Sequence, residues 1–311
     1  MNLTQAQRFR GLVAAPFTPF NENLSVNLDR IPSYANLLRD NGVIAAFICG
    51  TTGEGLSLTT DERLRIAEKW MESADEKLRV IVHVGHNCMA DAQRLTAHAG
   101  EIGASAIGAF APNFFKPRDH DELADWCARI SEAAPAMPFY YYHIPSMTGV
   151  NLPVAPLLSR AAEKLPSLAG VKYTHNDFDD YEACVRFAEG RYDILFGRDE
   201  LLLESWSRNA LGAVGSTYNY AAPLYSQLLQ HLAAGKENQA RALQDKAIEM
   251  ISICNNVGVT HLAASKAVMA MLGVDCGPVR PPLRNPTAAE LTELRRRLDA
   301  ADFFSTACRA A

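Results

Sequence analysis

The chain has 311 residues, enough for one large α/β domain or two smaller ones. Its formal net charge of −5 gives no electrostatic reason to expect nucleic acid or an anionic membrane as a partner. No apolar stretch is long enough to span a bilayer, and the polar segment Met1–Arg10 lacks a signal-peptide core, so we expect a cytoplasmic protein. The seven cysteines are dispersed without a Cys-x-x-Cys pair, which favours reduced thiols over a disulfide or zinc framework.

Short apolar runs recur along the chain, separated by stretches that resemble helices. The runs are β-branched or aromatic and too continuous to alternate, as expected for parallel strands buried on both faces. Thr59 and Glu62 fit a capping box that opens the helix expected at Thr60–Met71, and further amphipathic stretches follow at Ala90–Ile102 and Glu122–Ala133. The predicted strands are Val13–Phe17, Ile44–Cys49, Val80–Val84, Ala106–Ala111, Phe139–Tyr142, Leu168–Tyr173, Ile194–Phe196 and Ala213–Ser216.

Eight strand–helix units within about 230 residues match a (β/α)₈ TIM barrel, whose usual length is roughly 250 residues. A doubly wound open sheet is the alternative, but it normally has fewer strands. From Lys236 onward the pattern is helical, with helices expected at Lys236–Val257, His261–Leu272 and Thr287–Ala300. We therefore predict a barrel over residues 1–235 that carries the active site, and a C-terminal helical extension over residues 236–311 packed on it.

Lys172 is the most informative single residue, because it ends the apolar run Leu168–Val171 at the carboxyl end of a predicted strand. A lysine taken out of water there loses hydration that favours its charged form, so its pKa should fall. The neutral amine can then attack a ketone and form a Schiff base. The alternative is a lysine whose ammonium group extends from the strand end to solvent.

Further polar side chains are expected at the same rim, where the carboxyl ends of barrel strands meet. The glycine-rich loop Gly50–Gly55 suits either a small anion or a tight turn. Strand alternation puts Tyr140 and Tyr142 on one face and Tyr141 on the other, so at least one of the three should point into the barrel. The candidate site residues are Thr51, Thr52, Tyr142, Lys172, Thr174, Gly197, Asp199, Glu200 and Ser216.

Two other side-chain sets are weaker candidates for chemistry. His83 and His86 have a spacing that suits a strand end and the following loop, and no carboxylate or third histidine lies close in sequence. We therefore expect structural roles for them and no metal site. Cys49 beside the glycine loop lacks a nearby histidine partner, so we expect a buried structural thiol.

Four motifs in this order carry a family resemblance over about Gly11–Leu298. They are Gly50–Glu54, Tyr142–Gly149, Gly170–Lys172 and Gly215–Asn219. They resemble the dihydrodipicolinate synthase / N-acetylneuraminate lyase family of class I pyruvate-dependent aldolases. The resemblance implies a (β/α)₈ barrel with a C-terminal helical extension, a homotetramer and no cofactor.

Individual positions separate the branches of this family. Met147 stands where the dihydrodipicolinate branch usually has an arginine that holds a substrate carboxylate. Asp199 and Glu200 match the acidic pair with which the N-acetylneuraminate lyase branch binds the hydroxyl tail of a sugar acid. One departure is Phe114-Phe115, which replaces a tyrosine pair from which many members extend one side chain into a neighbouring subunit.

The resemblance implies reversible aldol cleavage of N-acetylneuraminate, a sialic acid, to N-acetylmannosamine and pyruvate. Lys172 would form the Schiff base, and Tyr142 would be the general acid–base. Two alternatives stay open: an aldolase or dehydratase for a shorter 2-keto-3-deoxy sugar acid, and a non-catalytic sugar-acid-binding regulator. The implied roles of the others are binding of the carboxylate by Thr51 and Thr52, orientation of the reacting hydroxyl by Thr174, and binding of the polyol tail by Gly197, Asp199, Glu200 and Ser216.

Overall fold

In the computed structural model, which describes residues 1, 3–5 and 7–309, eight parallel strands close into one barrel. Each strand pairs with its neighbours in sequence, and β1 pairs with β8 through Gly11↔Gly212 to Ala14↔Gly215. The predicted (β/α)₈ barrel is therefore confirmed, and the open-sheet alternative is wrong. The strands are β1 Gly11–Ala14, β2 Ala45–Ile48, β3 Arg79–His83, β4 Ala106–Phe110, β5 Phe139–His143, β6 Leu168–Tyr173, β7 Asp193–Phe196 and β8 Gly212–Gly215.

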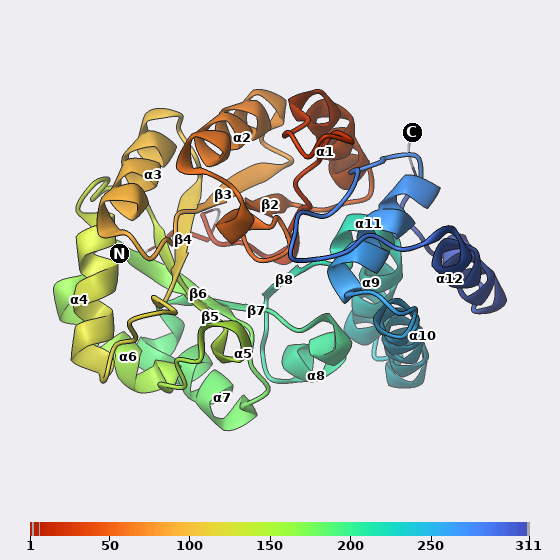
Figure 1. The fold of residues 1–311 in the computed structure, drawn as a ribbon. Coiled ribbons are helices and arrows are strands. Elements are labelled where there is room, and N and C mark those ends of the chain that lie inside the picture. Colours follow the sequence, from red (N-terminus) through yellow and green to blue (C-terminus); the bar gives the residue numbers. More distant parts are fainter. Residues whose placement is uncertain (2, 6, 310–311) are drawn as a thin grey trace.

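Helices surround the barrel, and the C-terminal ones gather on one side of it (Figure 1). The predicted capping box is present, since Thr59 accepts from the Glu62 amide and Glu62 accepts from the Thr59 amide. The helices are α1 Ile31–Asp40, α2 Thr60–Ser73, α3 Met89–Glu101, α4 His120–Ser131, α5 Pro145–Thr148, α6 Val154–Lys164, α7 Phe178–Arg186, α8 Leu202–Ser207, α9 Tyr218–Ala233, α10 Glu237–Asn255, α11 His261–Met271 and α12 Ala288–Ala300.

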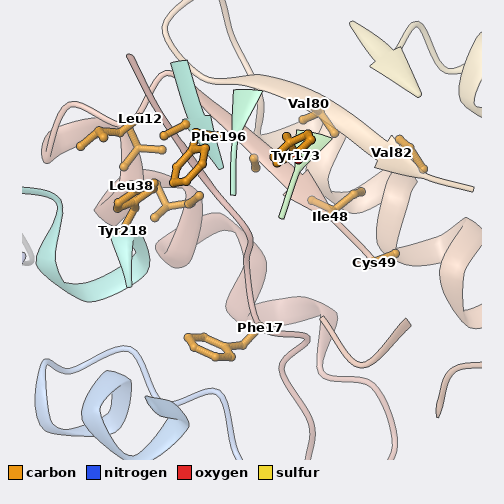
Figure 2. Close-up of a cluster of buried hydrophobic side chains, with 14 of the residues drawn as sticks. Leu12, Phe17, Leu38, Ile48, Cys49, Val80, Val82, Tyr173, Phe196 and Tyr218 are labelled. Carbon is orange, nitrogen blue, oxygen red and sulfur yellow. The ribbon is translucent and has the colours of Figure 1, made fainter. Parts of the chain in front are cut away.

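The predicted element bounds differ from the observed ones mainly at the first strand. β1 ends at Ala14, whereas the sequence predicted a strand up to Phe17. Pro16 has no amide hydrogen to contribute to a ladder, so the chain leaves the sheet before it. Phe17 is still buried, but as a loop residue beyond the strand (Figure 2).

Alternation along the strands divides the buried apolar side chains into two groups. Val80, Val82 and Ile48 belong to the large cluster between strands and helices, part of which Figure 2 shows. Phe47 and Ile81 belong to a smaller cluster inside the barrel. Odd and even positions of one strand thus serve different layers, as expected for strands buried on both faces.

The amino end of the barrel is closed, which leaves the carboxyl end for the site. Buried Asp193, the first residue of β7, accepts hydrogen bonds from the Phe9 amide and the Tyr140 hydroxyl, each at 2.9 Å. The Arg79 guanidinium lies 4.0 Å from the centre of the Phe9 ring. The amino end of the barrel is therefore occupied by side chains that pack against or hydrogen-bond with one another.

The C-terminal extension contacts the last barrel helix. α10 packs along α9 and also touches α11 and α12 (Figure 1). The predicted extension covered residues 236–311, and its last two residues lie outside the described part of the chain. Within that described part, no helix is both long and apolar enough to cross a bilayer.

Candidate active site

Lys172 lies inside the barrel, in the layer of side chains next to the carboxyl rim. The register pairs it with Tyr142 of β5 and Leu195 of β7. It is only 4 % exposed, so the alternative of a side chain extending to solvent is wrong. Its Nζ atom lies 4.0 Å from the centre of the Tyr142 ring and 4.2 Å from that of Phe47. Burial lowers the pKa of this amine to about 7, against an opposing effect of the Asp199 charge.

Tyr142 is the second buried titratable group beside this amine. As alternation predicted, Tyr140 and Tyr142 belong to the cluster inside the barrel, whereas Tyr141 faces the helices. The Tyr142 hydroxyl lies 3.3 Å from the Thr51 hydroxyl. Burial raises the pKa of the phenol to about 12, although hydrogen bonding with Thr51 and Thr174 opposes the shift. The phenol is therefore protonated at neutral pH.

The glycine-rich loop after β2 brings two hydroxyls to the same cavity. Thr51 and Thr52 both line it, and the loop turns sharply because the Glu54 amide donates to the Thr51 carbonyl at 3.1 Å. The Gly55 amide donates to the Gly50 carbonyl at 3.0 Å. These two threonine hydroxyls are neutral donors, and a carboxylate can accept hydrogen bonds from both.

Two glycines allow polar side chains to approach the backbone at the rim. A Cβ at position 197 would lie 2.0 Å from the Thr174 hydroxyl oxygen, so Gly197 leaves the space that Thr174 occupies. A Cβ at position 215 would lie 1.8 Å from Asp199 Oδ1, so only glycine lets Asp199 lie against β8. The side chains of Thr174 and Asp199 can therefore lie close to the strand ends, because glycine leaves room for them there.

Asp199 and Glu200 are adjacent in sequence but have different surroundings. Asp199 is buried, and its Oδ2 atom accepts from the Thr217 amide at 2.9 Å and the Thr217 hydroxyl at 2.6 Å. Burial raises the pKa of its carboxyl to about 6, against the opposing hydrogen bonds from Thr217. Glu200 is partly exposed, and its Oε1 atom accepts from Nε of Arg198 at 2.9 Å. The sequence reasoning missed this arginine.

One cavity of about 270 Å³ brings the predicted residues together. Its lining also includes residues that the sequence reasoning did not name as site residues, among them Arg198 and three side chains from the C-terminal extension. A second cavity of about 540 Å³ shares Thr51, Thr52, Ile144, Ser216 and His261 with the first. The predicted residues that line the first cavity are Thr51, Thr52, Tyr142, Lys172, Thr174, Gly197, Asp199, Glu200 and Ser216, and the three from the extension are Ile251, Asn255 and His261.

The weaker candidates take structural or separate positions. Cys49 is buried, and burial raises its pKa to about 11, which opposes a role as a thiolate nucleophile. His83 is buried inside the barrel, where Nδ1 lies 3.1 Å from the Cys49 carbonyl oxygen. His86 instead groups with Cys88 and Asp91, the set of three possible metal ligands found among residues 1, 3–5 and 7–309. The sequence reasoning therefore overlooked Asp91 as a carboxylate close to His86, and His83 is not a member of this group.

The positions that distinguish family branches are exposed. Met147 of α5 is 62 % exposed and lines the second cavity. Because its side chain is neutral, it gives this cavity no positive charge. Phe114 and Phe115, in the loop after β4, are 77 % and 86 % exposed and contact each other edge to face.

A closed parallel barrel with a buried lysine at its carboxyl rim is the arrangement expected of a class I aldolase. The sequence profile of the Dihydrodipicolinate synthetase family matches residues 8–301, and the chain belongs to this family. It is 38 % identical over 304 residues to N-acetylneuraminate lyase of Mus musculus, covering 96 % of this chain and 95 % of that one. It is 40 % identical over 283 residues to N-acetylneuraminate lyase of Danio rerio, covering 90 % and 92 %.

Solved structures agree with this assignment. The structure of Proteus mirabilis N-acetylneuraminate lyase superposes with a TM-score of 0.92 at 37 % identity, covering 95 % of this chain and 99 % of that one. The resemblance seen in the four sequence motifs is therefore confirmed at the level of family and fold.

Proposed function

We propose that this chain is an N-acetylneuraminate lyase that reversibly cleaves N-acetylneuraminate to N-acetylmannosamine and pyruvate. The observation that carries the proposal is the buried amine of Lys172, whose pKa is lowered to about 7 at the floor of a polar cavity. The relatives named above are lyases of this kind, and they match along almost the whole chain. A regulator without turnover would not need an amine that is neutral near physiological pH.

The proposed reaction begins at Lys172. Its neutral amine attacks the C2 ketone of the open-chain sugar acid, and loss of water together with uptake of one proton from solvent gives a protonated imine. This cation withdraws the electron pair of the C3–C4 bond, so the bond breaks and an enamine of pyruvate remains on the lysine. Protonation at C3 and hydrolysis of the imine then release pyruvate and restore the amine. Thr51 and Thr52 would hold the C1 carboxylate during these steps.

Tyr142 is proposed to move the proton that bond cleavage requires. The C4 hydroxyl must lose its proton as it becomes the aldehyde of N-acetylmannosamine. Because the phenol is protonated at neutral pH, it can accept this proton only if it passes its own proton on. The proposed acceptor of the phenol's proton is the substrate carboxylate, which Thr51 would hold beside Tyr142. The hydroxyl oxygens of Thr51 and Tyr142 lie 3.3 Å apart, which supports this placement. Thr174 would orient the reacting hydroxyl.

The distal part of the cavity is proposed to select the sugar tail. Asp199, Glu200 and Ser216 offer oxygen atoms that accept hydrogen bonds from hydroxyls, and the Gly197 backbone adds a further polar group. Arg198 holds Glu200 by a hydrogen-bonded ion pair and so orients that carboxylate. An enzyme for a shorter 2-keto-3-deoxy acid would use Lys172 in the same way and would not need these groups.

We also propose that the enzyme acts as a homotetramer in the cytoplasm. The exposed pair Phe114 and Phe115 supports association, since two adjacent exposed aromatic rings favour burial against another surface. The seven free cysteines fit a reducing compartment. Light scattering coupled to size-exclusion chromatography tests the assembly state.

Trapping with pyruvate and borohydride tests the proposed chemistry. Reduction should label the protein irreversibly, and peptide mapping should locate the label on Lys172. Label on Lys266, or no label, would contradict the Schiff-base mechanism. Pyruvate release from N-acetylneuraminate, compared with release from a six-carbon 2-keto-3-deoxy acid, then separates the proposed substrate from the shorter alternative.

A further inference from the structure

We propose that Lys266, in the C-terminal extension, is a positioning residue that holds the carboxylate-binding loop in shape through Glu54, together with the main-chain amide of Arg280. The role of the loop, binding of a keto-acid carboxylate by Thr51 and Thr52, rests on the proposed function. Neither Lys266 nor Arg280 lines the cavity that contains Lys172. Their effect on the reaction would therefore pass through Glu54.

Glu54 occupies a backbone conformation that needs support from its surroundings. Its φ angle is 54°, in the left-handed region that residues other than glycine rarely adopt. Such a residue persists only where neighbouring structure holds it in place. The Glu54 side chain is 1 % exposed, so its carboxylate also needs partners to replace the lost water.

The partners of the Glu54 carboxylate come from more than 200 residues away in the chain. Lys266 Nζ donates to Glu54 Oε1 at 3.0 Å across a separation of 212 residues. The Arg280 amide donates to Glu54 Oε2 at 2.8 Å across 226 residues. Lys266 also donates to the Pro278 carbonyl at 2.6 Å, and its own side chain is only 2 % exposed. One buried ammonium group thus joins the loop after β2 to α11 and to the segment that follows it.

This ion pair lies directly behind the turn that presents the two threonines. The Glu54 amide donates to the Thr51 carbonyl, so a displacement of Glu54 changes the turn that carries Thr51 and Thr52. On the other side, the Thr18 hydroxyl donates to the Gly53 carbonyl at 2.6 Å. The loop is therefore held between the segment after β1 and the C-terminal extension, and loss of one support should let the hydroxyls move relative to Lys172.

The test measures the pyruvate concentration that half-saturates borohydride trapping on Lys172. For Lys266→Met we expect it to rise about tenfold, the equivalent of one weakened hydrogen bond to a charged carboxylate. The maximal trapping rate at saturating pyruvate should stay within about threefold of wild type, since the amine itself is unchanged. Glu54→Gln should have a similar effect, because an amide cannot accept hydrogen bonds on both sides.

Two comparisons separate positioning from a general loss of stability. The double variant Glu54→Gln/Lys266→Met should raise half-saturation by less than the product of the single effects, since both act through one contact. Tyr140→Phe is the matched control, because it removes a buried hydrogen bond to Asp193 at the opposite end of the barrel. It should lower the melting temperature and leave half-saturation by pyruvate unchanged.

The outcomes are distinguishable from those of the proposed function. Hydrogen–deuterium exchange needs no substrate and should rise at residues 50–55 in Lys266→Met; in Tyr140→Phe it should not. A wild type that pyruvate labels but that does not cleave N-acetylneuraminate contradicts the proposed substrate alone. Folded variants with wild-type half-saturation, or an equal rise in Tyr140→Phe, would overturn the positioning role. If Lys266→Met does not fold, Glu54→Gln decides by the same two measurements.

Discussion

The rate at which Lys172 forms an imine with pyruvate should rise with pH and level off just above neutrality. Burial beside Phe47 and Tyr142 lowers the pKa of its amine from 10.5 to about 7, because the ammonium form loses hydration there. Only the neutral amine attacks a carbonyl, so the reactive fraction grows as pH rises through this pKa. About 9 % of the amine is neutral one unit below the pKa and about 91 % one unit above it.

The measurement is the second-order rate constant of pyruvate-dependent borohydride inactivation, followed from about pH 5 to pH 10. We expect a plateau above about pH 8 and a fall of about tenfold between pH 8 and pH 6. An amine of ordinary pKa would instead gain about tenfold per unit up to about pH 10. A rate that still climbs steeply above about pH 9 would refute the inference that burial activates Lys172.

The Asp199→Asn variant tests the direction in which the charge of Asp199 shifts the pKa of Lys172. The Asp199 carboxylate raises the pKa of Lys172, so removal of its charge should lower that pKa and move the midpoint to lower pH. The asparagine side chain has almost the same size, so the packing against Gly215 is retained. A midpoint that moves to higher pH would show that the carboxylate acts on the amine in another way.

Three further predictions concern proton transfer, substrate choice and metal dependence. Tyr142→Phe should lower kcat for N-acetylneuraminate by roughly 10²–10⁴, the usual contribution of one positioned acid–base group, while pyruvate trapping persists; an unchanged kcat would remove the role of Tyr142. Asp199→Ala and Glu200→Ala should each lower kcat/KM for N-acetylneuraminate, with a loss of transition-state stabilisation of roughly 1.5–3 kcal/mol per hydrogen bond removed. A clear wild-type preference for a six-carbon 2-keto-3-deoxy acid, unaltered in both variants, would favour the shorter substrate. Turnover should survive exhaustive chelation, because the proposed steps need only an amine and a phenol; loss restored by zinc would contradict this.

Much of the fold and the centre of the site could be predicted because their signals are local in sequence. A buried parallel strand is a continuous apolar run, and a barrel places functional groups where such runs end. Lys172 at the end of Leu168–Tyr173 and Tyr142 near the end of Phe139–His143 follow from these two rules. The first strand was predicted too far along the chain, because Val13–Phe17 is apolar throughout, whereas the observed strand is Gly11–Ala14.

Other parts of the site depend on contacts between distant segments, for which the sequence has no local pattern. Asn255 and His261 reach the cavity only because the extension packs along α9 and brings α11 over the rim. The pairing of Glu54 with Lys266 joins residues 212 positions apart. The sequence reasoning also treated Asp199 and Glu200 as one pair, whereas Asp199 is buried against Gly215 and Glu200 is held by Arg198.

The aromatic surroundings of Lys172 favour the reaction at two stages for one physical reason. Burial opposes the ammonium form because a compact cation loses much hydration, so the amine is neutral when the ketone arrives. The protonated imine that follows is larger and spreads its charge over carbon and nitrogen, so it loses less hydration in the same place. The faces of Tyr142 and Phe47, within 4.2 Å of Nζ, attract either cation by about 0.5–2 kcal/mol, so the difference between the two cations lies in their hydration. A site built this way disfavours a charged free lysine while it tolerates a charged intermediate, which is the difference that catalysis requires.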